Sequence, residues 1–114
     1  IRIDVADFDI RDIQPSPLDG VELTEKAAAD AGVSCMRVET MAGHDSVAVN
    51  RIAPSVMVFI PSVDGVSHCE REFSTDADMV AGVNAFTQIA RRLTTGALDN
   101  TAPGEPFAAT AERI

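Results

Sequence analysis

The run of apolar residues at positions 56–60, Val-Met-Val-Phe-Ile, constrains the fold of this chain more than any other segment. Successive side chains of a β-strand point to opposite faces of its sheet, so a strand that is apolar throughout is typical of a sheet covered by helices on both faces. Pro54 marks the end of the preceding helix, because proline cannot continue a helix. The run therefore predicts a buried strand.

A helix is predicted in the first third of the chain. Residues 21–31 are rich in alanine and end at Gly32, a residue suited to a left-handed helix C-cap. Asp19, with Glu22 three residues later, resembles the capping box that begins many helices.

A second, longer helix is predicted after the strand. Thr75 and Asp78 open it and Gly96 ends it, with Arg91 and Arg92 placed at the negative end of the helix dipole. Apolar residues recur along it at spacings of four and three and form one stripe, at Met79, Val83, Phe86, Ala90 and Leu93.

The remaining periodic segments complete an alternating pattern. Residues 1–13 repeat apolar side chains with a period near two and predict a half-buried strand, and residues 33–39 predict a short second strand. Residues 45–52 predict a short helix capped by Asp45 or Ser46. Strands that alternate with helices in this order predict the α/β class.

Charge and composition narrow the possible partners. The formal net charge is −9, and the single lysine, Lys26, and the arginines form no basic cluster. Nucleic acids and anionic membrane surfaces both bind clustered basic residues, so we expect neither as a partner.

No apolar stretch approaches the roughly 20 residues of a membrane span. Two cysteines, Cys35 and Cys69, are too few for a disulfide framework, so we expect a soluble protein of the reducing cytoplasm. The start on a strand-like run at Ile1 suggests a piece of a longer protein.

Both histidines of the chain follow predicted strands. In an open α/β sheet, ligands bind outside the carboxyl ends of the strands, so two successive strand-end loops are expected to face one crevice. Gly43 lets a ligand approach the backbone, and His44 can donate to an anion such as a carboxylate. His68 can supply a nitrogen ligand to zinc or a related ion. From spacing alone, a turn glycine, a helix-end histidine and a loop histidine without a metal are the more frequent interpretations.

Other polar residues near the second loop are weaker candidates. Cys69 could be a nucleophile activated by His44, but no third orienting group is evident, and a bystander thiol is favoured. Glu70 and Glu72 could act as acid–base groups, but such carboxylates in an acidic protein are usually solvated.

Three stretches together carry a family resemblance: AGHDS, then APSVMVFIPSVDGVSHCEREF, then AGVNAFTQIARRL. In this order they resemble the C-terminal part of the hydantoinase/carbamoylase family of amidohydrolases. That family includes N-carbamoyl-L-amino-acid hydrolases, allantoate amidohydrolases and β-ureidopropionase-like enzymes. The resemblance covers about residues 21–93.

The resemblance implies a domain organisation. Residues 18–96 correspond to the C-terminal part of a catalytic α/β domain of the zinc-exopeptidase type, with a lid domain inserted into it in the full protein. Residues 1–17 correspond to the last lid strand and the segment that crosses back, and residues 97–114 are expected to form a loosely ordered tail. The lid implies a homodimer of the full-length protein.

The resemblance also implies roles for the site residues. His68 matches a metal ligand, Gly43 and His44 match positions that contact the carboxylate end of the substrate, and Asp45 braces their loop. Each full-length subunit is implied to hold two divalent ions, of Zn, Mn, Co or Ni, and to hydrolyse a carbamoyl or ureido C–N bond of a small carboxylated substrate. The other metal ligands and the general base would precede Ile1, so this piece alone contains no catalytic residue and should be inactive.

Departures from the family pattern and rival interpretations stay open. Thr40 and Met41 stand where the family has small residues, and Arg11 lies too close to the glycine-histidine loop to match the arginine of the lid. A non-catalytic α/β module for ligand binding or assembly would keep these loops without the chemistry. An aminopeptidase or deacylase of the same superfamily would share them.

Overall fold

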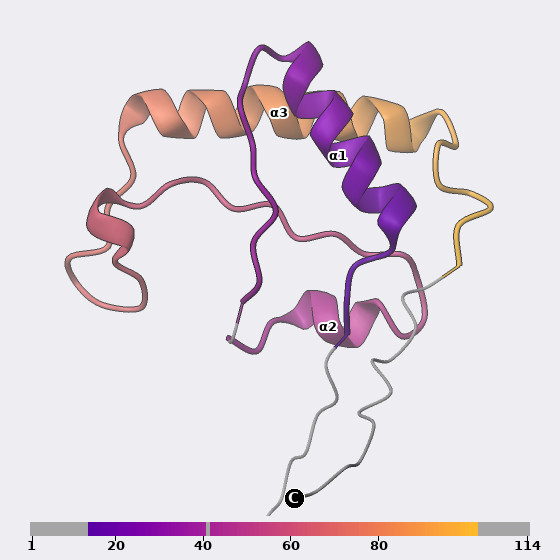
Figure 1. The fold of residues 1–114 in the computed structure, drawn as a ribbon, viewed down its shortest axis with the longest axis horizontal. Helices are drawn as coiled ribbons and strands as arrows, with labels where there is room; N and C mark the ends of the chain where they lie inside the picture. The colour runs from indigo at the N-terminus through magenta and orange to yellow at the C-terminus, as the bar shows by residue number, and fades with distance from the viewer. Residues whose placement is uncertain (1–13, 41, 103–114) are drawn as a thin grey trace, which may run out of the picture.

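The computed structural model describes residues 14–40 and 42–102. These residues form three α-helices, α1 (Leu18–Asp30), α2 (Asp45–Val49) and α3 (Asp76–Thr94), and one 3₁₀ turn, η1 (Val63–Gly65). Figure 1 shows α1 crossing in front of α3, with α2 on the other side of a long extended segment. The predicted strand at 1–13, Met41 and the end of the predicted tail at 103–114 lie outside the described residues.

Helix α1 confirms the prediction of a helix at 21–31 but begins earlier, after Pro17. The predicted capping box is wrong: Asp19 lies inside the first turn, and no side chain caps the helix. At the other end Gly32 has the expected left-handed backbone, with φ +70°. The N–H of Val33 donates to the carbonyl of Ala28 at 2.9 Å, which closes the helix end as in a Schellman motif.

The contact between α1 and α3 forms the core of the described residues. Its buried apolar side chains are mostly small: Ala27 and Ala28 from α1, and Ala85 and Ile89 from α3. Small side chains let two helix backbones approach closely. Asp30 forms an ion pair with Arg92, which joins the C-terminal ends of the two helices.

Helix α3 begins as predicted, with the Thr75 hydroxyl accepting the N–H of Asp78 at 3.1 Å. Its buried positions, Ala85 and Ile89, lie beside the predicted apolar stripe rather than in it. In that stripe the large side chains of Met79, Val83, Phe86 and Leu93 are all exposed. The helix therefore has two apolar faces, and the described residues cover only one of them.

The two strands predicted in the described part are extended but unpaired. Residues 34–40 and 55–61 make no backbone–backbone hydrogen bond with other described residues. A β-strand is defined by a hydrogen-bonded neighbour, and neither segment has one in the part of the chain that the structure describes. The α/β class is therefore not confirmed by these helices alone.

Segment 55–61 nevertheless packs closely against both long helices, because each helix has a glycine where the segment approaches it. A Cβ at Gly20 of α1 would lie 2.5 Å from Cγ2 of Val56, and one at Gly82 of α3 would collide with Cγ2 of Ile60. Figure 1 shows this segment running between the two long helices and α2.

Buried Asn50 connects the end of α2 to the rest of the chain. Its side-chain amide donates to the carbonyl of Pro15 at 2.7 Å, and its side-chain oxygen accepts the N–H of Ser55 at 3.0 Å. A buried amide that is satisfied on both sides specifies one arrangement of the segments it joins. Asn50 thus sets the start of segment 55–61 relative to α2.

The other extended segment is joined to α1 by a two-point ion pair. Nε and Nη2 of Arg37 donate to the two carboxylate oxygens of Glu25 at 2.7 and 2.9 Å. These hydrogen bonds from Arg37 lower the pKa of Glu25 and raise the pKa of Arg37.

Among the described helices, none is long and apolar enough to cross a membrane.

We predict that Gly82→Ala destabilises the full-length protein. Alanine favours a helix by up to about 1 kcal/mol over glycine, but a Cβ there collides with Ile60, and overpacking typically costs about 1–3 kcal/mol. Denaturant unfolding measures the balance. Asn84→Ala, at an exposed position of the same helix, is the control and should be neutral or slightly stabilising. Equal stability of the two variants would contradict the close contact.

We also predict that Glu25→Gln makes stability less dependent on acid pH. The pKa of folded Glu25 is lowered, so the pair stabilises the fold above the unfolded pKa of about 4.3, and this is lost as the pH falls through the folded pKa. Thermal unfolding should show the wild type more stable near neutral pH and the difference vanishing in acid. Glu22→Gln, also on α1 and without an ion pair among the described residues, leaves the Glu25–Arg37 pair intact and should show the same pH dependence of stability as the wild type. An equal pH dependence in the two variants would refute the assignment.

Candidate functional site

The first histidine begins helix α2. The N-cap residue is His44, and its Nδ1 accepts the backbone N–H of Ser46 at 3.1 Å. The prediction that Asp45 or Ser46 caps this helix is wrong, because the imidazole nitrogen takes the acceptor role. An accepting Nδ1 carries no proton, so the proton of the neutral ring is on Nε2. His44 is exposed and can offer this N–H to a ligand.

Gly43, next to His44, lies in open space. It is exposed, and a Cβ built on it would meet no heavy atom within 4 Å. No packing contact among the described residues therefore requires a glycine here. Open backbone beside a donor is compatible with the predicted contact to a substrate carboxylate.

The second histidine lies in a loop that is closed at its base. The N–H of Val63 donates to the carbonyl of Phe73 at 2.8 Å, and the hydroxyl of Ser74 donates to the carbonyl of Pro61 at 2.7 Å. The Ser62 hydroxyl also donates to the carbonyl of Val66, at 2.5 Å. These bonds hold the end of segment 55–61 against the start of α3.

Within this loop, His68 is held from two sides. Its φ is +58°, an uncommon left-handed backbone for a residue other than glycine. Its N–H donates to Oε2 of Glu72 at 2.8 Å, and its Nδ1 lies 2.5 Å from Oγ of Ser67. Its Nε2 has no hydrogen-bond partner among the described residues.

The neighbouring side chains do not form a catalytic pair with His68. Cys69 is a free, exposed cysteine, and no hydrogen bond joins it to either histidine in the described part of the chain. Glu70 is exposed. Glu72 is also exposed, as expected, but its contact with His68 was not predicted, because the contact depends on a left-handed backbone that no sequence pattern at this loop indicates.

The described residues supply one candidate metal ligand, His68, and do not form a complete metal site. Within residues 14–40 and 42–102, no group of three or more His, Cys, Asp or Glu side chains could hold an ion. In Figure 1 the loop after η1 and the start of α2 lie on the same side of segment 55–61, away from α3. No hydrogen bond joins His44 to His68 in these residues, so their shared crevice stays a prediction.

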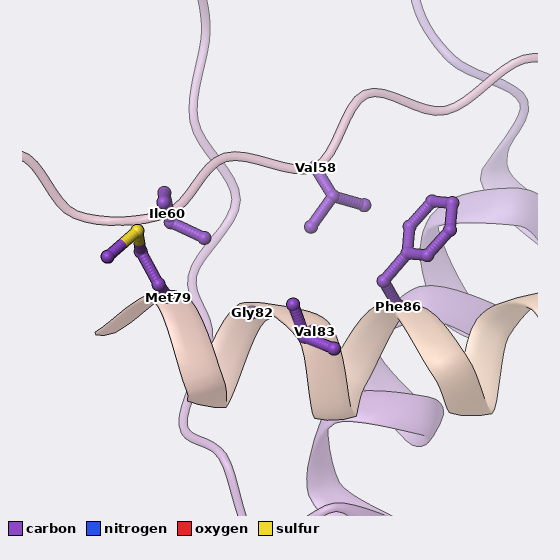
Figure 2. Close-up of a pocket in the computed structure, with 6 residues that line it drawn as sticks. All are labelled: Val58, Ile60, Met79, Gly82, Val83 and Phe86. Carbon is purple, nitrogen blue, oxygen red and sulfur yellow. The ribbon is translucent and has the colours of Figure 1, made fainter. Parts of the chain in front are cut away.

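An apolar hollow lies elsewhere, between segment 55–61 and the exposed stripe of α3. Figure 2 shows Val58 and Ile60 of the extended segment opposite Met79 and Phe86 of α3. Its remaining lining residues are Gly82 and Val83. No predicted site residue lines it, and none of its lining residues has a charged or hydrogen-bonding side chain that could bind a carboxylate.

Comparison with known proteins gives the chain its relatives. The profile of the peptidase family M20/M25/M40 matches residues 3–92. A Mycolicibacterium smegmatis protein with a provisional hydrolase name is 48% identical over 76% of this chain and 20% of its own length. The allantoate amidohydrolase of Bacillus subtilis is 35% identical over 71% of this chain and 20% of its own length.

A third relative, the N-carbamoyl-L-amino acid amidohydrolase of Geobacillus stearothermophilus, is 32% identical over 66% of this chain and 18% of its own length. The chain thus spans about a fifth of the length of these relatives. No solved structure gives a significant match. These matches confirm the resemblance to allantoate and N-carbamoyl amino acid amidohydrolases.

Proposed function

Because this chain belongs to the peptidase family M20/M25/M40, we propose that it is part of a metal-dependent amidohydrolase. The enzyme hydrolyses a carbamoyl or ureido C–N bond of a small carboxylated substrate. The observation that carries this proposal is the family match over residues 3–92, which spans both histidine loops, together with relatives named as amidohydrolases of allantoate and N-carbamoyl amino acids.

In this proposal His68 holds one of two divalent ions, of Zn, Mn, Co or Ni, through Nε2. The geometry of the ring supports the role: with its proton on Nδ1 next to Ser67, the neutral imidazole directs the Nε2 lone pair outward. When bound, the ions polarise the scissile carbonyl and lower the pKa of the attacking water. The other metal ligands and the general base would come from other parts of the full-length protein.

His44 and Gly43 orient the substrate. With Nδ1 of His44 accepting from Ser46, its Nε2–H donates to the substrate carboxylate, which approaches over the open backbone of Gly43. Asp45 lies in the first turn of α2 and braces this loop. Holding a substrate in a reactive geometry can supply much of the rate enhancement of an enzyme.

The exposed apolar surface supports the view that the chain is one part of a larger catalytic α/β domain. Val83 and Phe86 are 64% and 62% exposed, and they line the hollow between α3 and the unpaired segment 55–61. A helix with apolar residues on two faces belongs in the interior of a domain. Strands from the remainder of the domain would pair with this segment. The full-length protein would be a cytoplasmic homodimer that is joined through its lid.

The family also includes peptidases by its name, so an aminopeptidase or deacylase is the second candidate. We predict that the metal-loaded full-length protein releases ammonia from N-carbamoyl-L-amino acids or from allantoate, and that chelation of the metal abolishes turnover. Dipeptides and N-acyl amino acids, assayed in parallel, should be poor substrates. Preferential cleavage of either would support the second candidate. Binding of small carboxylates without turnover or metal would support a non-catalytic module.

A further inference from the structure

We propose that Glu72 is a positioning residue for His68. Its carboxylate accepts the N–H of His68 and holds the backbone in the conformation that presents Nε2 of the imidazole to the metal. This inference rests on the proposed function, because it concerns the residue that we assign as a metal ligand. It adds a member to the site that neither the family motif nor the spacing of the histidines indicated.

The first support is the way in which Glu72 closes the turn around His68. Its side chain accepts the N–H of His68 at 2.8 Å, and its own N–H donates to the carbonyl of Cys69 at 2.9 Å. A hydrogen bond from an N–H to an ionised carboxylate is stronger than one to a neutral acceptor. It therefore helps to offset the unfavourable left-handed backbone of His68, with φ +58°.

The second support is that Glu72 itself is anchored. The next residue, Phe73, accepts the N–H of Val63 at 2.8 Å, and Ser74 is bonded to Pro61. The carboxylate of Glu72 thus extends from a fixed point at the base of the loop. Through its hydrogen bond to the N–H of His68, Glu72 fixes the backbone of His68 relative to the base of the loop.

The third support is that the ring is fixed independently of the backbone. Oγ of Ser67 lies 2.5 Å from Nδ1 of His68, and with Nδ1 protonated this contact leaves the lone pair on Nε2. Histidine ligands of metals commonly have a hydrogen-bond partner at the other ring nitrogen, which sets the tautomer and the orientation of the ring. Ser67 acts on the ring, whereas Glu72 acts on the backbone that carries it.

Glu70 provides a matched control in the same turn. It is an exposed glutamate two residues before Glu72, and it makes no hydrogen bond among the described residues. A general loss of negative charge near the metal would affect variants of both residues. Loss of the contact to His68 would affect only variants of Glu72.

The test measures metal affinity in the full-length protein. The protein is stripped with a chelator and titrated with Zn²⁺ against a competing chelator, and the absorption spectrum of the Co²⁺ form is recorded. Loss of a partner that orients a ligand typically weakens metal binding about 10- to 100-fold, and we expect this for Glu72→Ala at one ion, with a changed Co²⁺ spectrum. Glu72→Gln keeps an acceptor oxygen and should restore affinity and spectrum. Glu70→Ala should bind as the wild type does.

His68→Ala separates this inference from the proposed function. If it still binds two ions with wild-type affinity, the assignment of His68 as a ligand fails, and the inference fails with it. If His68→Ala loses one ion while Glu72→Ala binds as Glu70→Ala does, only the role of Glu72 is overturned.

A folding defect is tested with a second variant. Thermal unfolding of Glu72→Ala shows whether it folds, and Glu72→Met, which keeps the side-chain length without an acceptor, replaces it if it does not. Weak binding by a folded Glu72→Met supports the proposal. Failure of both variants to fold overturns it, because Glu72 would then support the fold rather than position His68.

Discussion

The close approach of segment 55–61 to helices α1 and α3 is the constraint on which the rest of the described structure depends. It requires glycine at positions 20 and 82, where any side chain would meet Val56 or Ile60. Both histidine loops are connected to this segment. Its end continues into the closed loop of His68, and its start is bonded through Asn50 to the end of α2, the helix that His44 begins.

The two histidines are oriented by different means, and the difference matches their proposed roles. At His44 the Nδ1 atom accepts a backbone N–H, which leaves a proton on Nε2 for a carboxylate. At His68 the Nδ1 atom faces a hydroxyl that can accept a hydrogen bond from an Nδ1–H, and this tautomer has a lone pair on Nε2 for a metal. In the proposed site, two residues of one type thus present a donor and an acceptor, because their Nδ1 atoms have different local partners.

Local sequence signals predicted the elements that local interactions determine. The alanine-rich run with Gly32 predicted α1, and Thr75 with its apolar repeat predicted α3. The cap of α2 was missed because histidine replaced the usual oxygen acceptor. The segments at 34–40 and 55–61 are extended as predicted but make no backbone–backbone hydrogen bond among the described residues, because strand pairing depends on contacts distant in sequence rather than on a local pattern. The hydrogen bond between Glu72 and His68 was missed because it depends on the left-handed backbone of one residue, His68.

The central claim is that His68 binds a divalent ion through Nε2, with Nδ1 directed to Ser67. Anomalous diffraction at the zinc absorption edge, from crystals of the zinc-loaded full-length protein, tests it most directly. We expect an anomalous peak at a bonding distance of about 2.0–2.1 Å from Nε2 of His68. Anomalous peaks that all lie away from His68, or a peak bonded to Nδ1 instead, would contradict it.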